Sequence, residues 1–400
     1  MSHHPETATA GRPPSPGLRI LSEPVRPERF TPLSEPSLRS WPAVGSATLP
    51  APAGEAARLP HSHRLTDAFG RQLTYLRVSV TDRCNLRCTY CLPEDADFPF
   101  GDRDLLRPEE IEAMVGALVR LGIRRVRLTG GEPLVRKDIL EIARRVKALP
   151  GVENLALSTN GTELARLAEP LRAAGVDRVN ISLDSLDAER FRAITRRGSL
   201  EAVWNGVEAA LAAGFSPVKL NAVLLSRQNL DDVDRLVELT LNRPLSVRFI
   251  EMMPTASNRH LQPDEYVSSD VVKQRIEERF GQLLPLDPRH AAAGPRTGPA
   301  ATYQLAGAQG AVGFITPLSH TFCADCNRLR LTARGELRLC LFADRVFPLR
   351  QLLEPSGPAS PESAAALEAE ILRVLQDKPA EHMLARGDYG NLVSFMEIGG

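Results

Sequence analysis

The chain has six cysteines, which fall into two groups of three with none left over. Cys84, Cys88 and Cys91 are spaced by three and then two residues. Three thiolates on a short loop can hold three irons of a cubane iron–sulfur cluster, in which each iron normally takes one cysteine. One iron then stays open to a different ligand. Zinc sites mostly use cysteine pairs two residues apart, so this spacing favours a cluster.

The second group contains Cys323, Cys326 and Cys340. His320 stands three residues before Cys323, so a zinc site with three cysteines and one histidine fits this spacing as well as a second cluster does. A disulfide framework is expected in short secreted chains and not in one of this length.

Composition narrows the class of protein. The chain is 43% hydrophobic and 24% charged, with a net charge of zero, which argues against broad binding of nucleic acid or acidic membranes. No window reaches the ~18 uncharged apolar residues of a membrane helix. The opening residues lack the apolar core of a secretory signal. We therefore expect a cytoplasmic protein.

Apolar periodicity predicts strands that alternate with helices after a Pro/Ala-rich, disordered extension over residues 1–62. The predicted strands are 75–80, 126–129, 155–158, 179–183, 218–224 and 247–250, and the predicted helices are 108–121, 138–149, 163–174, 200–213 and 230–241. This alternation implies parallel βαβ units. Six units suit an incomplete (β/α)6 TIM-like barrel or an open doubly wound sheet, and periodicity alone does not decide between them.

A Pro/Gly/Ala-rich stretch near residues 286–299 predicts a domain boundary. Short strands follow at 302–305, 311–315, 327–332 and 336–339, and a helix at 363–376. We therefore expect a barrel domain over 63–286. Residues 287–400 would form a C-terminal α+β extension that closes the barrel opening, carries the second cysteine group and ends in Gly399 and Gly400.

Polar or glycine-rich residues end each predicted strand of the barrel. Barrels and open α/β sheets bind ligands at that edge. Singly, these residues would be turns, solvated charges or core, but together they predict one binding site. They are the first cysteine group, 130–133, 158–161, 182–184, Lys219 with Asn221, and 248–253.

Two segments resemble a known family. TDRCNLRCTYCLPE resembles the signature of the radical S-adenosylmethionine superfamily, with Leu86 and Leu92 where relatives often have Phe and Met. SHTFCADCNRLRLTARGELRLCLF resembles the C-terminal cluster segment of the molybdenum cofactor biosynthesis protein A family, the GTP 3',8-cyclases. Together they cover roughly residues 70 to 345. The resemblance implies two [4Fe–4S] clusters, with S-adenosylmethionine on the first and the guanine of GTP on the second.

The resemblance also implies which residues bind. S-adenosylmethionine contacts fall on Tyr90, Gly131, Ser182 and Met253. GTP contacts fall on Arg77, Arg127, Ser158, Lys219, Arg328, Leu329 and Arg330, with Arg248 adding charge near the phosphates. The implied reaction gives (8S)-3',8-cyclo-7,8-dihydroguanosine 5'-triphosphate, the first step of molybdenum cofactor biosynthesis. The Gly-Gly tail is expected to enter the active site.

The expected partners are GTP as substrate, an electron donor, and a downstream cyclic pyranopterin monophosphate synthase, with no nucleic acid or membrane. A homodimer is left open. One rival interpretation is a radical enzyme with an auxiliary cluster that modifies a peptide, although such enzymes usually carry more C-terminal cysteines. Another is a non-enzymatic metal-binding scaffold with a C-terminal zinc module.

Overall fold

A computed structural model of the chain describes residues 65–98, 101–255, 258, 261, 265–286, 298–343, 345–354 and 360–382. The predicted N-terminal extension over 1–62 and the pair Gly399 and Gly400 lie outside the described residues. Every helix in the described part of the chain is too short or too polar to cross a membrane.

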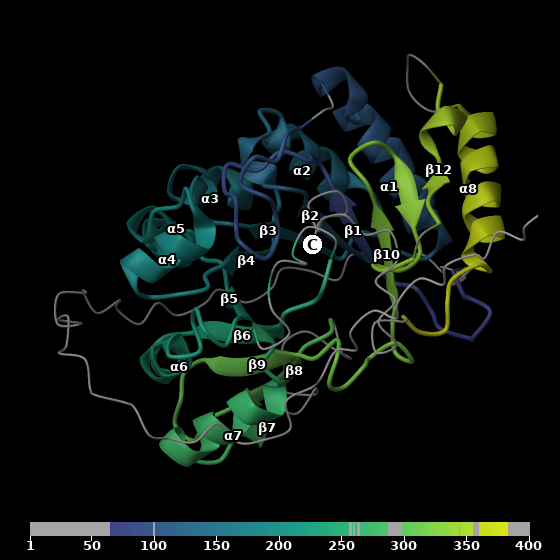
Figure 1. Ribbon diagram of the computed structural model, residues 1–400. Coiled ribbons are helices and arrows are strands. Elements are labelled where there is room, and N and C mark those ends of the chain that lie inside the picture. The colour runs from purple at the N-terminus through teal and green to yellow at the C-terminus, as the bar shows by residue number, and fades with distance from the viewer. Residues whose placement is uncertain are drawn as a thin grey trace, which may run out of the picture.

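Six parallel strands follow one another in sequence order and form the barrel wall. They are β1 (Tyr75–Ser79), β2 (Arg125–Thr129), β3 (Asn154–Thr159), β4 (Arg178–Ser182), β5 (Val218–Leu224) and β6 (Leu245–Glu251). Right-handed crossovers between strands in this order place all connecting helices on one side. The array therefore curls around its other face, as Figure 1 shows, and the incomplete TIM-like barrel is confirmed over the doubly wound alternative.

The barrel helices cover the outer face of this wall. They are α1 (Pro108–Leu121), α2 (Ile139–Ala148), α3 (Leu164–Ala173), α4 (Ala188–Thr195), α5 (Leu200–Ala212) and α6 (Asp232–Asn242), with α7 (Ser269–Phe280) after β6. Outward strand residues such as Leu76, Val78 and Leu128 are fully buried against them. The apolar core therefore lies between wall and helices, and the inner face is left to polar residues.

The C-terminal strands attach to both edges of the six-stranded wall. β9 (Ala311–Ile315) pairs in parallel with β6, and β10 (Arg328–Leu331) pairs in parallel with β1. Figure 1 shows the two pairs on separate sides of the barrel. Residues 316–327, called here the crossing segment, must therefore span the open side of the barrel, as expected for an extension that closes it.

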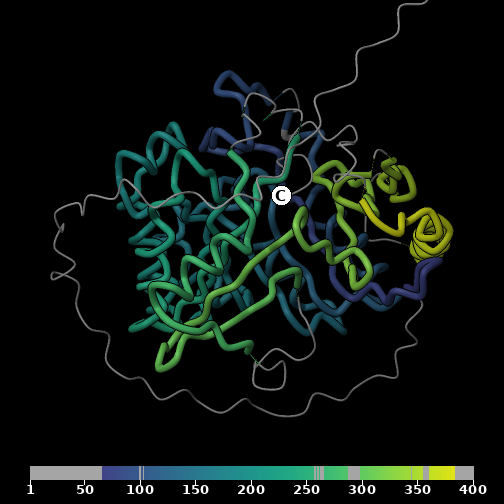
Figure 2. The backbone as a smooth tube through the Cα atoms, turned by 60° about the horizontal axis from the view of Figure 1, so that its bottom comes forward, coloured from purple at the N-terminus to yellow at the C-terminus, as the bar shows by residue number. Residues whose placement is uncertain are grey.

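Shorter antiparallel strands complete one continuous sheet. β8 (Ala301–Gln304) and β7 (Leu284–Pro285) continue beyond β9, and β11 (Glu336–Arg338) and β12 (Phe347–Pro348) continue beyond β10. Helix α8 (Pro361–Leu375) packs beside α1. Both views place α8 on the flank opposite the teal helices α3 to α5 (Figure 2). The sheet runs through both predicted domains, whose boundary near residue 286 stays a prediction.

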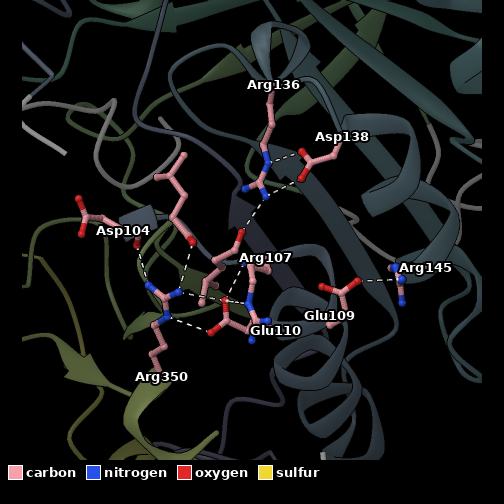
Figure 3. Close-up of polar contacts among 10 residues, drawn as sticks. Asp104, Arg107, Glu109, Glu110, Arg136, Asp138, Arg145 and Arg350 are labelled. Carbon is pink, nitrogen blue, oxygen red and sulfur yellow. Dashed lines mark hydrogen bonds and ion pairs between the residues drawn. The ribbon is translucent and has the colours of Figure 1, made fainter. Parts of the chain in front are cut away.

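Arg350 fastens the extension to the barrel. It lies on the 3-10 helix η6 (Arg350–Leu352) and pairs with Glu110 of α1 at 3.0 Å. It also donates to the carbonyl of Asp104 at 2.8 Å (Figure 3). Burial alone would raise the pKa of Glu110, but the Arg107 backbone N–H and the Arg350 guanidinium hold it below its usual value. The β10 side of the extension is thus held by a charge-assisted contact.

Glu251 fastens the crossing segment on the opposite side. This buried carboxylate ends β6 and accepts hydrogen bonds from the backbone N–H groups of Leu318 (3.1 Å) and Ser319 (3.0 Å). It also accepts from the N–H of Ser269, at the start of α7, at 3.0 Å. One side chain therefore joins β6, α7 and the crossing segment.

Glu251→Gln should loosen this junction. The amide nitrogen of glutamine cannot accept from backbone N–H groups, so a buried donor would lose its partner, at a cost of ~1–3 kcal/mol of unfolding free energy. Urea denaturation would measure the loss, and hydrogen exchange should rise over residues 316–327. Glu208→Gln, which removes a partly exposed pair with Arg243, is the control and should change stability by less than ~1 kcal/mol. Equal stability of the two variants would contradict the assigned role.

Candidate active site

One cavity of about 550 Å³ occupies the barrel interior, and all six cysteines line it. Its size falls within the ~300–1,000 Å³ of ligand-binding pockets. All six thiols are free. The cavity is therefore a single chamber with two cysteine triplets in its wall.

The first triplet lies at the carboxyl end of β1. The chain turns between Cys88 and Leu92, where the N–H groups of Cys91 and Leu92 donate to the carbonyl of Cys88 at 2.9 and 3.0 Å. Burial raises the pKa of Cys84 to about 11. Burial also raises the pKa of Cys88 well above its usual value, and the neighbouring charges of Asp184, Cys91 and Cys84 add to this. Thiols crowded in this way ionise when metal replaces their protons, which fits a cluster site.

Two glycines let the loop after β2 approach this triplet. A Cβ on Gly130 would lie 2.4 Å from the Thr81 carbonyl oxygen, and one on Gly131 would lie 2.3 Å from that of Arg83. Gly130 also has φ +153°, which disfavours other residues. The N–H of Gly131 donates to Thr81 at 2.8 Å. The glycines are therefore needed for packing against the cysteine loop, in addition to any ligand contact.

The second triplet lies at the other end of the barrel. Cys323 and Cys326 belong to the crossing segment just before β10, and Cys340 follows β11. Because β10 runs parallel to β1, Cys326 is placed at the amino-terminal end of the barrel strands. β1 has five residues, so about 16 Å of strand separates the two ends. The triplets thus face one chamber from its two ends.

The electrostatic setting of the second triplet differs from that of the first. Burial alone would raise the pKa of Cys326, but Arg328 and Lys378 outweigh it and lower the pKa to about 7. A large share of Cys326 is therefore thiolate near neutral pH even without metal. This is the ionisation state that a metal ligand needs.

His320 does not join the second triplet. Its ring nitrogen lies 2.9 Å from a carboxylate oxygen of Asp270 on α7, and its side chain is exposed. It lines a separate hollow beside the chamber. Among the described residues, no three His, Cys, Asp or Glu side chains are arranged for a single metal ion. His320 therefore does not supply the fourth ligand that the zinc alternative assigned to it.

Between the two triplets, the barrel wall carries a row of arginines. In the strand register Arg330 lies beside Arg77, Arg77 beside Arg127, Arg127 beside Ala156, and Ala156 beside Arg178. We call Arg330, Arg77, Arg127 and Arg178 the arginine row. All four line the chamber, since alternate strand residues share a face.

Burial lowers the pKa of basic groups in the arginine row and of the basic side chains around it. Burial, with Arg328 nearby, lowers the pKa of Arg330 to about 10. Burial and Arg127 lower the pKa of Arg248 to about 10. Burial and the charges of Arg248, Arg127 and Arg178 lower the pKa of Lys219 to about 6. This density of positive charge in a recessed chamber attracts a polyanion.

Arg127 is fixed in place by its neighbours. Its Nη1 donates to the Ser158 hydroxyl at 3.1 Å, and its Nε donates to the hydroxyl of Tyr75. Burial alone would raise the pKa of Tyr75, yet Arg127 and Arg77 lower it below its usual value. The guanidinium is therefore oriented before any ligand arrives.

The residues predicted for S-adenosylmethionine gather at the first triplet. The hydroxyl of Tyr90 donates to Asp184 at 2.8 Å. The Asn258 side chain donates to the carbonyls of Tyr90 (3.0 Å) and Met253 (2.9 Å). Burial raises the pKa of Asp184 to about 6, although Val223 and Tyr90 hydrogen bonds lower it. A rigid pocket with a carboxylate thus adjoins the first triplet.

The structure brings nearly all predicted site residues into this chamber. Its lining includes Tyr90, Gly131, Ser182, Met253, Arg77, Arg127, Ser158, Lys219, Arg248, Arg328 and Arg330. Leu329 is the exception. Its side chain is fully buried in the apolar core because it alternates with its two arginine neighbours on β10.

Sequence reasoning missed several lining residues. They include Arg125, Asn154, Arg178 and Asn180. Alternate residues of a strand share one face, and this rule would have identified three of them. Arg125 stands two residues before Arg127 on β2, and Arg178 and Asn180 stand four and two residues before Ser182 on β4. Asp184 lies within the segment 182–184 that the sequence did single out.

Comparison with known proteins agrees with this site. Residues 78–240 match the family model described as Radical SAM superfamily, and residues 245–384 match Molybdenum Cofactor Synthesis C. A protein of Ectopseudomonas mendocina (strain ymp) described as GTP 3',8-cyclase is 46% identical over 341 residues, covering 85% of this chain and 99% of that protein. One of Heliobacterium modesticaldum with the same description is 47% identical over 339 residues, covering 84% and 100%.

Among solved structures, Streptococcus suis SuiB bound to precursor peptide SuiA superposes with a TM-score of 0.52 at 14% identity, covering 78% of this chain and 67% of that chain. This likeness concerns the fold alone. The sequence relatives, matched over nearly their full length, establish that the chain belongs to the GTP 3',8-cyclase family of the radical SAM superfamily.

Proposed function

We propose that this chain converts GTP to (8S)-3',8-cyclo-7,8-dihydroguanosine 5'-triphosphate, the first step of molybdenum cofactor biosynthesis. The observation that carries the proposal is the single barrel chamber with a cysteine triplet at each end and the arginine row between them. The relatives described as GTP 3',8-cyclases support the choice of substrate.

The first triplet fits a [4Fe–4S] cluster with S-adenosylmethionine, since its three crowded thiols leave one iron to another ligand. Tyr90, Gly131, Ser182 and Met253 would hold the cofactor, and Asp184 would add a carboxylate to the wall of its pocket. When bound, this pair supplies one-electron radical chemistry at the ribose. The protein's part is to orient Tyr90 through Asp184 and Asn258.

The second triplet fits a second [4Fe–4S] cluster, which would face the guanine base. The arginine row, Lys219, Arg248 and Arg328 would bind the triphosphate, because guanidinium groups match phosphate oxygens in geometry and charge. A nucleotide held at its base and its phosphates presents the ribose to the first triplet in a fixed orientation. Fixed orientation accounts for much of the rate of an intramolecular ring closure.

The remaining partners follow from this chemistry. An electron donor must reduce the first cluster, and a cyclic pyranopterin monophosphate synthase would consume the product. We place the enzyme in the cytoplasm, where thiols stay reduced. Whether a homodimer forms is a question for solution measurements of mass.

Anaerobic reconstitution followed by a turnover assay tests the function. The chain should bind about eight irons, and release of 5'-deoxyadenosine should depend on GTP. Cys340→Ser should keep about four irons and lose GTP-dependent turnover, which shows that the second triplet serves the nucleotide. Release of 5'-deoxyadenosine that ignores GTP would instead support the peptide-modifying alternative, and four irons with one zinc would support the zinc alternative.

Arg330→Met should weaken GTP binding far more than guanosine binding. A charge-assisted hydrogen bond contributes ~1.5–3 kcal/mol, so the Kd for GTP should rise ~10–100-fold, while guanosine carries no phosphate to lose. Equilibrium binding to reconstituted protein measures both. Arg373→Met, which removes an exposed arginine of α8 paired with Glu370, is the matched control. An equal loss for GTP and guanosine would mean that Arg330 does not serve the phosphates.

GTP binding should take up a proton through Lys219. Its pKa of about 6 makes the free amine neutral at pH 8, and a bound triphosphate would raise that pKa toward the usual ~10.4. The affinity should therefore fall as pH rises from 7 to 9, with uptake of ~1 proton. Calorimetry in buffers of different ionisation enthalpy measures the uptake. Lys219→Met should bind more weakly and show no uptake. Identical proton uptake in the variant would assign the titration to another group.

A further inference from the structure

Lys378 is a buried lysine beside the second cysteine triplet. After α8, the N–H groups of Asp377 and Lys378 donate to the carbonyls of Val374 (3.0 Å) and Leu375 (3.1 Å), which turns the chain. The Lys378 side chain then points inward, and the residue is only 3% exposed. Its Nζ donates to the carbonyl of Arg328 at 3.2 Å and to that of Leu339.

These two carbonyls belong to the backbone that carries the cysteines. Arg328 stands two residues after Cys326, and Leu339 immediately precedes Cys340. The ammonium group therefore lies where the chain segments of Cys326 and Cys340 meet. Burial, the largest effect, lowers the pKa of Lys378, while the charges of Cys326 and Cys340 raise it. Backbone carbonyls next to two of the three cysteines thus hold the Lys378 Nζ in place.

A buried ammonium group is costly unless negative charge faces it. The hydrogen-bond acceptors of Lys378 are neutral carbonyls, and no described carboxylate forms an ion pair with it within 4.0 Å. The nearby groups that would carry negative charge are the sulfurs of Cys326 and Cys340 once they bind metal. At the first triplet the nearby buried charge is the carboxylate of Asp184, which acts in the opposite direction on Cys88. The nearby charges therefore act in opposite directions on Cys88 and on Cys326.

Arg71 ties the same segment to the third cysteine. Its Nη1 donates to the carbonyls of Cys323 (2.9 Å) and Ala380 (2.8 Å), and its Nη2 donates to that of Pro379 (2.6 Å). Asp67 pairs with its Nε at 2.6 Å and fixes the guanidinium. Residues 378–380 are thereby docked onto all three cysteine-bearing segments, which holds Lys378 in position.

We propose that Lys378 is the resident counter-charge of the second cysteine triplet, stabilising the thiolate-bound cluster there and keeping its reduction potential high. This inference rests on the proposed function, since it requires a cluster at this triplet. Lys378 does not line the chamber, so it is a positioning residue that acts through the cysteines and not through the substrate.

The test uses the full chain with Cys84, Cys88 and Cys91 changed to Ser, so that the second cluster is observed alone after anaerobic reconstitution. Lys378→Met removes the charge, Lys378→Gln keeps hydrogen-bond donors without charge, and Lys378→Arg keeps the charge. Iron release to a chelator and the midpoint potential of the cluster are measured. The Met and Gln variants should release iron ~10–100-fold faster, as for other outer-shell changes at metal sites, with a more negative potential. The Arg variant should stay near the parent.

Lys147→Met is the control, because Lys147 on α2 pairs with Asp177 and touches neither triplet. It should leave both measurements unchanged. Parent-like iron release and potential in the Gln variant would overturn the proposal, as would an Arg variant that shifts as far as Met. If the Met variant does not fold, the Gln and Arg variants still decide. A parent chain without a second cluster would overturn the proposed function too, and its iron count reveals this before any variant is compared.

Discussion

Charge crowding inside the barrel is the constraint on which the rest of this structure depends. Strand alternation sends Leu76, Val78 and Leu329 to the helix-covered face and sends Arg77 and Arg330 into the chamber. Desolvation and mutual repulsion both oppose such an interior. The apolar layer between the wall and the helices must therefore offset the unfavourable free energy of the charged interior. A bound polyanion would relieve the repulsion, so ligand binding and folding stability are coupled.

The two ends of the chamber differ in how nearby charges affect the cysteine pKa values. At the first triplet, burial raises the pKa of Cys84, and burial together with the carboxylate of Asp184 raises the pKa of Cys88. At the second triplet, Arg328 and Lys378 favour the thiolate of Cys326. A cationic sulfonium suits the first environment, and an electron-rich base with its phosphates suits the second.

Much of the fold could be predicted because local signals mark it. Both ends of the helix over 108–121 are predictable, because Pro108 favours the start of a helix and Gly122 favours its end. Helices α4 and α7 were missed: α4 has eight residues, and the α7 sequence SDVVKQRIEERF is too charged to show a clear apolar face. The pairing of β10 with β1 could not be predicted, since it depends on contacts between distant parts of the chain.

For the candidate site, too, some residues could be predicted from the sequence and others could not. Cysteine spacing and family motifs identified both triplets and most of the chamber lining. The predicted second, third and fourth strands each began one residue late, which left Arg125, Asn154 and Arg178 outside them. These residues form the amino-terminal end of the chamber wall. These three residues are polar because they face the chamber. An apolar pattern therefore does not include them, and the sequence gives no signal that the strand has already begun.

The pairing of β1 with β10 also determines when folding of the barrel can be completed. Tyr75 leaves the ribosome early, and its partner Arg328 follows only after the whole barrel wall has been synthesised. Contacts between such distant segments form late. Until then, the first cysteine triplet of the nascent chain lies on a sheet whose open side is not yet closed. The three cysteines of the first triplet lie within eight residues of chain, whereas Cys326 and Cys340 of the second triplet come together only when β10 and β11 pair.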